Sequence, residues 1–210
     1  MRNLKVIAHI KTGFSDKFGI PRQSGMVKGV MAQIIFESEY RNPDAIRGLD
    51  GFSHIWVLWE FSESIRETWS PTVRPPRLGG NKRMGVFATR SPFRPNPIGL
   101  SSVKIEKIEI SEELGPIIWV SGADILDGTP IYDIKPYLPF TDSHVDAKAG
   151  FTTEYEGYSL NVNIDEGIKS KIPRDMLDTV VELLAADPRP SYQNDKDRVY
   201  GMRFYEYERK

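Results

Sequence analysis

Residues 54–61 read His-Ile-Trp-Val-Leu-Trp-Glu-Phe, and this stretch decides the expected fold. Every second side chain is apolar and falls on one face of an extended segment: Ile55, Val57, Trp59 and Phe61. Alternation with a period of two is typical of a strand that buries one face. We therefore expect a strand over His54–Phe61.

Six further segments on both sides of this strand are rich in β-branched and aromatic residues. They are Val6–Thr12, Met26–Glu37, Met84–Thr89, Leu100–Ile110, Ile117–Leu126 and Tyr155–Ile164. In Leu100–Ile110 the alternation slips between Ile105 and Ile108, which predicts a β-bulge near Lys107. Seven strands with few crossover helices predict a mainly β fold, a barrel or a sandwich, rather than a doubly wound α/β sheet.

The end of the chain has a different pattern. One helix is expected over Pro173–Ala186, because proline suits its first turn and Pro188 stops it. Val199–Tyr207 alternates again and predicts a strand. We therefore divide the chain into a β domain at residues 1–146 and a small α+β domain at residues 147–210.

Composition excludes several kinds of site. The 210 residues include no cysteine, which excludes disulfides, thiolate zinc sites, iron–sulfur ligation and cysteine nucleophiles. The three histidines, His9, His54 and His144, lack the spacing of a metal site, so we expect no metal. The longest apolar run, Ile55–Trp59, is too short to span a membrane, and Met1–Lys11 does not resemble a signal segment. We expect a cytoplasmic protein with no membrane contact.

The net charge of −1 is unevenly distributed along the chain. Residues 68–105 contain no Asp or Glu, although the whole chain has 29 of them. That window is +7 and the remainder is therefore −8. A basic segment without acids predicts an anionic ligand. Its cations are Arg74, Arg77, Lys82, Arg83, Arg90, Arg94 and Lys104.

Common nucleotide and nucleophile motifs are missing: the chain has no Gly-x-Gly-x-x-Gly and no Gly-x-Ser-x-Gly. Three other segments stand out, namely Pro21-Arg-Gln23, the proline-rich Arg74–Ser101, and the turn Asp124-Ile-Leu-Asp-Gly-Thr-Pro130. Prolines fix the backbone of the second segment, so its arginines lose little entropy on binding. Arginines, an amide and an acidic Asp-Gly turn together suit a polar cofactor that carries a cation and a carboxylate.

These segments carry a family resemblance that extends over most of the chain. Pro21-Arg-Gln23, Gly48–Ile55, Arg74–Asn81, Gly85–Ser101, Leu126–Phe140 and Asp187-Pro-Arg-Pro-Ser-Tyr192 resemble the TsaA-like domain, also called YaeB-like or VirR-like. The whole chain is similar to the TrmO family of tRNA N6-adenosine methyltransferases. The resemblance implies that the β domain is a barrel that binds S-adenosyl-L-methionine without a Rossmann domain. It also implies a homodimer with the cofactor near the subunit interface.

The implied reaction methylates N6 of threonylcarbamoyl-adenosine beside the tRNA anticodon. Carried over residue by residue, the resemblance implies that these positions bind the cofactor: Pro21, Arg22, Gln23, His54, Ile55, Arg90, Leu100, Leu126, Asp127, Gly128 and Thr129. The resemblance also implies that Ile55 forms part of the wall of the cofactor pocket. No catalytic base is assigned.

The basic window favours RNA over a small-molecule substrate, because phosphate contacts dominate tRNA affinity. We expect the tRNA to meet Arg77, Lys82, Arg83 and Arg94. Two alternatives remain open at this point. One is a non-catalytic S-adenosyl-L-methionine-binding module with an RNA-associated or regulatory role, and the other is a methyltransferase that acts on another substrate.

Overall fold

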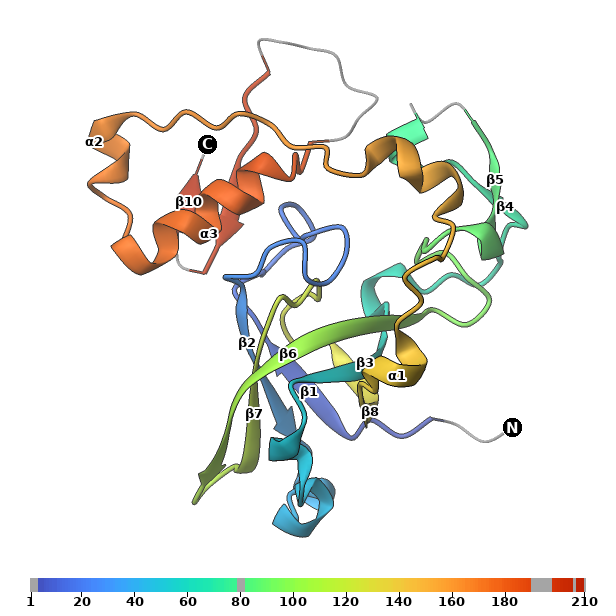
Figure 1. Cartoon of the computed structure of the whole chain (residues 1–210), viewed down its shortest axis with the longest axis vertical. Helices are drawn as coiled ribbons and strands as arrows, with labels where there is room; N and C mark the ends of the chain where they lie inside the picture. The colour runs from blue at the N-terminus through green and yellow to red at the C-terminus, as the bar shows by residue number, and fades with distance from the viewer. Residues whose placement is uncertain (1–3, 79–81, 190–197, 206, 210) are drawn as a thin grey trace.

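The computed structural model describes residues 4–78, 82–189, 198–205 and 207–209. At its centre, six antiparallel strands form a closed barrel in the order β1-β2-β7-β6-β3-β8 (Figure 1). The strands are β1 (Ala8–Lys11), β2 (Met31–Phe36), β3 (His54–Glu60), β6 (Ile98–Ser111), β7 (Gly115–Ser121) and β8 (Pro130–Pro136). The predicted mainly β fold is confirmed, and it is a barrel rather than a sandwich.

Strand β3 carries the face that its alternation predicts. Ile55, Val57 and Trp59 are buried in the barrel core, while the residues between them are only partly buried. Trp59 also dictates its neighbour on β6, because a Cβ atom on Gly99 would lie 2.2 Å from the Trp59 ring. Glycine is therefore required at that point of the barrel wall.

The long strand β6 bends where the sequence predicts. Its register with β7 shifts between Ile105 and Lys107, which confirms the bulge near Lys107. An extra residue on one strand increases local twist and bends the ribbon. Strand β6 can thus pair with β3 at one end and with β7 over most of its other end.

Several predicted strands are shorter than expected or absent. β2 begins only at Met31 and β7 ends at Ser121, so residues 26–30 and 122–126 are not extended as predicted. In 84–89 only β5 (Met84–Gly85) is extended and pairs with β4 (Thr72–Val73), after which the Val86–Ala88 segment is a 3₁₀ turn closed by Thr89. The strand predicted over Tyr155–Ile164 is wrong: Tyr155 ends a 3₁₀ helix (Gly150–Tyr155), and residues 156–164 form no strand. Within them, the Leu160 N–H donates to the Ala185 carbonyl at 2.9 Å.

Strand β8 was not predicted. It begins and ends with proline, a residue that argues against a strand because it lacks a backbone donor. Barrel closure overrides this local signal, since β8 pairs with β3 on one side and with β1 on the other.

The predicted C-terminal helix is confirmed as α3 (Arg174–Ala185), with Pro173 directly before it. The expected strand at 199–207 is interrupted. It becomes the hairpin β9 (Met202–Phe204) and β10 (Tyr207–Arg209), with Tyr205 at a φ of 52° between them. Two further helices, α1 (Pro139–Asp142) and α2 (Glu166–Lys169), are single turns.

A second core joins the C-terminal elements to the loop between β1 and β2 (Figure 1). Its buried members are Phe14, Val27, Val30, Leu183, Met202 and Phe204. The C-terminal unit therefore packs on the N-terminal part of the chain, while its boundary at residue 146 stays a prediction. Across the described residues, the helices are all too short or too polar to traverse a lipid bilayer.

Candidate functional site

The three distinctive segments, Pro21–Gln23, Arg74–Ser101 and Asp124–Pro130, come together in the structure. The Arg90 guanidinium donates to the Gln23 side-chain oxygen, and the Gln23 amide nitrogen in turn donates to the Arg22 carbonyl. Arg90 also lies close enough to Asp124 to stabilise its negative charge. The contact brings together residues that are 67 positions apart in the sequence.

Asp124 is the carboxylate at the centre of this group. It accepts a hydrogen bond from Ser101 Oγ at 2.6 Å, and Trp59 Nε1 donates to the same hydroxyl at 3.0 Å. Burial raises the pKa of Asp124, while the bonds from Ser101, from the Asp124 and Ser24 backbones, and the charge of Arg90 oppose that rise. The site thus holds a carboxylate in a partly desolvated position next to a cation.

Asp124 was not predicted to be a site residue, although it opens the distinctive segment Asp124–Pro130. The available signal was a lone acid within an apolar run, Ala123-Asp-Ile-Leu126. Such an acid needs partners when it is buried. The partners Ser101 and Trp59 come from other strands, so the sequence did not reveal them.

The predicted Leu126–Thr129 turn is locked to the first strand. Thr12 N–H donates to Asp127 Oδ1 at 2.8 Å, and the Gly128 N–H donates to the Ile10 carbonyl at 2.9 Å. Gly128 has a φ of 74°, a conformation that glycine adopts without steric cost. Asp127 and Gly128 remain exposed, so a rigid turn faces solvent two residues beyond Ile125 in the core.

Arg22, which was expected to bind the cofactor, donates hydrogen bonds to the C-terminal unit. Its guanidinium donates to the backbone carbonyls of Asp187 and Arg189, both at 3.0 Å. The Asp187 carboxylate is in turn held by Arg189 Nε at 2.7 Å, and this bond lowers the pKa of Asp187. Arg22 therefore ties the Pro21–Gln23 turn to the C-terminal unit.

The structure does not bring His54 into contact with this group. His54 opens β3, pairs with Lys104 and hydrogen-bonds Ser53 Oγ at 2.9 Å. Ser101 lies opposite Val57, three residues along the strand and therefore about 10 Å away.

Two apolar strand residues that were expected to bind the cofactor, Ile55 and Leu100, face opposite sides of the barrel wall. Ile55 is 0% exposed and belongs to the barrel core, and its place in a pocket wall stays a prediction. Leu100 on β6 is 54% exposed and faces outward.

The residues expected to meet nucleic acid lie around the β4–β5 hairpin. Lys82 and Arg83 are exposed, and Arg83 donates to Thr72 Oγ1 at 3.3 Å. Arg94 is partly buried, because its guanidinium donates to the Val86 and Thr89 carbonyls at 3.3 and 2.8 Å. The side chain of Arg77 lies outside the described part of the structure.

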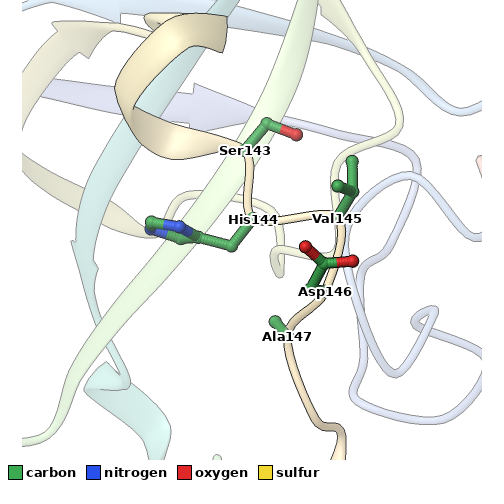
Figure 2. A pocket seen from close by; sticks show the side chains of 5 residues that line it. All are labelled: Ser143, His144, Val145, Asp146 and Ala147. Atoms are coloured by element: carbon green, nitrogen blue, oxygen red, sulfur yellow. The ribbon is translucent and has the colours of Figure 1, made fainter.

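A separate hollow is lined by Ser143, His144, Val145, Asp146 and Ala147 (Figure 2). It lies directly after α1, and all five residues are exposed members of one loop. The site residues described above take no part in its lining. Within the described ranges, no three His, Asp or Glu side chains gather in a way that could hold a metal ion.

Comparison with known proteins gives matches over both parts of the chain. A family model described as the tRNA-methyltransferase O N-terminal domain matches residues 9–143, and the TrmO C-terminal domain matches residues 159–209. The tRNA (adenine(37)-N6)-methyltransferase of Escherichia coli K12 is 41% identical over 198 residues, which are 91% of this chain and 83% of that protein.

Two further similarities concern the cofactor and the fold. A protein of Methanothermobacter thermautotrophicus named "Probable S-adenosyl-L-methionine-binding protein" is 36% identical over 140 residues, which are 67% of this chain and 93% of that protein. The crystal structure of TrmO from Pseudomonas aeruginosa superimposes with a TM-score of 0.76 at 29% identity. It covers 99% of this chain and 91% of the other.

Proposed function

This chain belongs to the TrmO family, and on that premise we propose that it transfers a methyl group from S-adenosyl-L-methionine to N6 of an adenosine in tRNA. The adenosine is the one at position 37, next to the anticodon, and carries a threonylcarbamoyl group. The name of the Escherichia coli relative supports the tRNA, the position and the atom. We also propose that the reaction takes place in the cytoplasm and needs no metal.

The observation that carries this proposal is the convergence of Gln23, Arg90 and Asp124 beside the rigid Asp127 turn. This donor set fits the cofactor chemically. Arg90 can pair with its carboxylate, and Asp124 or Asp127 can accept hydrogen bonds from its ammonium or ribose hydroxyls. Arg22 contributes by fixing the Pro21–Gln23 turn through the Asp187 and Arg189 carbonyls.

The chain's own contribution to catalysis is the orientation of the two reactants. A sulfonium cofactor supplies an electrophilic methyl group when it is bound. The displacement then needs the accepting nitrogen in line with that methyl, which a preorganised loop provides. The prolines of the Arg90–Ser101 segment hold this loop in place at low entropic cost on binding.

A homodimer with the cofactor site near the interface completes the proposal. Ile98 and Leu100 on β6 are both exposed on the outer wall of the barrel, where a second subunit would remove them from water. Along β3, His54 lies about 10 Å and Ile55 about 7 Å from Val57, the residue opposite Ser101 of the Asp124 group. A partner subunit placed over this wall would let His54 and the Asp124 group face one cofactor.

Arg90→Ala tests the cofactor site. We expect the variant to bind S-adenosyl-L-methionine about tenfold more weakly or worse, because a charge-assisted hydrogen bond is removed. Titration calorimetry measures the affinity, and thermal unfolding checks that the fold is kept. Arg83→Ala is the matched control, since Arg83 is an exposed arginine of the same basic window. Equal affinity of both variants and the wild type would contradict the role of Arg90.

The reaction itself is tested by mass spectrometry of nucleosides from tRNA incubated with the protein and S-adenosyl-L-methionine. We expect a gain of one methyl group on threonylcarbamoyl-adenosine. A protein that binds cofactor and tRNA but leaves every nucleoside unchanged would be the non-catalytic alternative instead.

A further inference from the structure

We propose that Trp69 and Phe87 form a platform on which unpaired bases of the tRNA stack while the target adenosine is methylated. The inference rests on the proposed function, because it names residues that hold the substrate of that reaction. It concerns aromatic side chains, whereas the sequence-based expectation concerned only cations.

The two rings are close together and open to solvent. Trp69 is 52% exposed and Phe87 is 71% exposed. Their ring centroids lie 6.1 Å apart, with planes inclined by 30°. Neither residue belongs to either hydrophobic core of the described chain. Exposed aromatic rings that pair outside a core mark a binding surface rather than a packing contact.

The fold holds this pair in place through the β4–β5 hairpin. Thr72 pairs with Gly85, and the Val86 N–H donates to the Pro71 carbonyl at 2.9 Å. These bonds hold the segment before β4, which contains Trp69, beside the segment after β5, which contains Phe87. Val86 is 1% exposed and anchors the turn from which Phe87 projects. The platform is therefore rigid at its base.

One cation lies beside the platform, and a second cation–ring contact involves Phe93 of the same loop. The Arg94 guanidinium lies 5.8 Å from the centroid of the Phe87 ring, and the Arg66 guanidinium lies 3.6 Å from that of the Phe93 ring. Residues 68–105 carry no acid that would repel a phosphate. Aromatic faces beside cations are the combination that single-stranded nucleic acid requires, because rings receive bases and cations receive phosphates.

The platform also lies close to the proposed cofactor site. Phe87 precedes Arg90 by three residues in the same loop. A base of the anticodon loop that stacks on Phe87 would thus hold its neighbours near the methyl donor. The bases of a duplex are already stacked on each other, so this surface selects unpaired RNA.

The test measures the affinity for an unmodified tRNA transcript as a function of salt for Trp69→Ala, Phe87→Ala and the double variant. We expect each single variant to bind about tenfold more weakly, since base stacking contributes on this scale. The slope of log affinity against log salt should stay unchanged, because every cation that neutralises a phosphate is kept. Trp69→Phe and Phe87→Tyr keep a ring and should bind within about threefold of the wild type.

Ile110→Ala is the control, because it removes an exposed apolar side chain at the far end of β6. Wild-type affinity in the double alanine variant would overturn the platform, and so would an equal loss of affinity for a blunt RNA duplex. A double variant that binds tRNA normally but changes the sedimentation of the protein alone would assign the rings to a protein contact instead. If the wild type methylates no tRNA, the proposed function fails, whereas a methylating wild type with unaffected variants refutes only the platform.

Discussion

At the scale of single residues, Asp124 is the group on which the candidate site depends. It accepts a hydrogen bond from Ser101, whose hydroxyl is fixed by Trp59, and the charge of Arg90 favours its ionised form. Burial is the larger influence, so its pKa is raised despite these partners. A carboxyl group kept in such a position costs folding stability whenever it is ionised.

This cost predicts a pH dependence. A carboxyl with a higher pKa in the folded than in the unfolded state binds its proton more tightly when folded. The free energy of unfolding of the wild type should therefore fall relative to Asp124→Asn as the pH rises from about 4, the ordinary aspartate value, through the raised pKa. Denaturant unfolding at a series of pH values measures the difference.

The asparagine keeps an oxygen that accepts the Ser101 bond, so packing changes little. Asp50→Asn, at an exposed position, is the control for a general effect of removing a charge. A wild type that gains stability over Asp124→Asn with rising pH would show that the partners outweigh burial.

At the scale of elements, the close approach of α3 to the β1–β2 loop holds the C-terminal unit against the barrel. A Cβ atom on Gly29 would lie 1.9 Å from Thr179 Oγ1 and 3.0 Å from Thr179 Cβ. Thr179 is itself buried at this contact. Glycine is required here by space rather than by its backbone angles.

Gly29→Ala should therefore destabilise the protein by about 1–3 kcal/mol, as overpacking does. Thr179→Ala removes the nearer obstacle, so the double variant should lose less than the sum of the two single losses. Chemical unfolding of all four proteins gives this coupling energy. Additive losses would mean that the cost of Gly29→Ala does not arise from a clash with the Thr179 side chain.

At the scale of the whole molecule, charge is divided between one basic segment and an acidic remainder of the chain. The +7 window of residues 68–105 includes the β4–β5 hairpin and the Arg90 loop, while the rest of the chain sums to −8. A polyanion should then meet one face only.

The affinity for tRNA should accordingly fall steeply with salt. Removing Arg77, Lys82 and Arg83 together by alanine substitution should weaken binding and flatten the slope by roughly 0.7–0.9 for each phosphate that is no longer neutralised. Cofactor affinity should stay nearly unchanged. Filter binding at several salt concentrations measures the slope, with Lys107→Ala on β6 as the control for an exposed lysine outside the window. A triple variant with the wild-type slope would move the RNA surface elsewhere.

The sequence by itself determined the features that depend on neighbouring residues. The buried face of β3, the bulge near Lys107 and the helix after Pro173 follow from alternation, its interruption and the stop signals beside it. The basic window and the motifs that resemble the TrmO family are likewise properties of the chain alone.

Only the tertiary structure decided which distant segments meet. It paired Gln23 with Arg90 and placed Asp124 beside them. It also set Trp69 against Phe87. Strand β8 formed despite its terminal prolines because closing the barrel required a partner for β1 and β3. The physical reason is that local periodicity is encoded within each segment, whereas these contacts depend on strand register and closure, to which the whole barrel contributes at once.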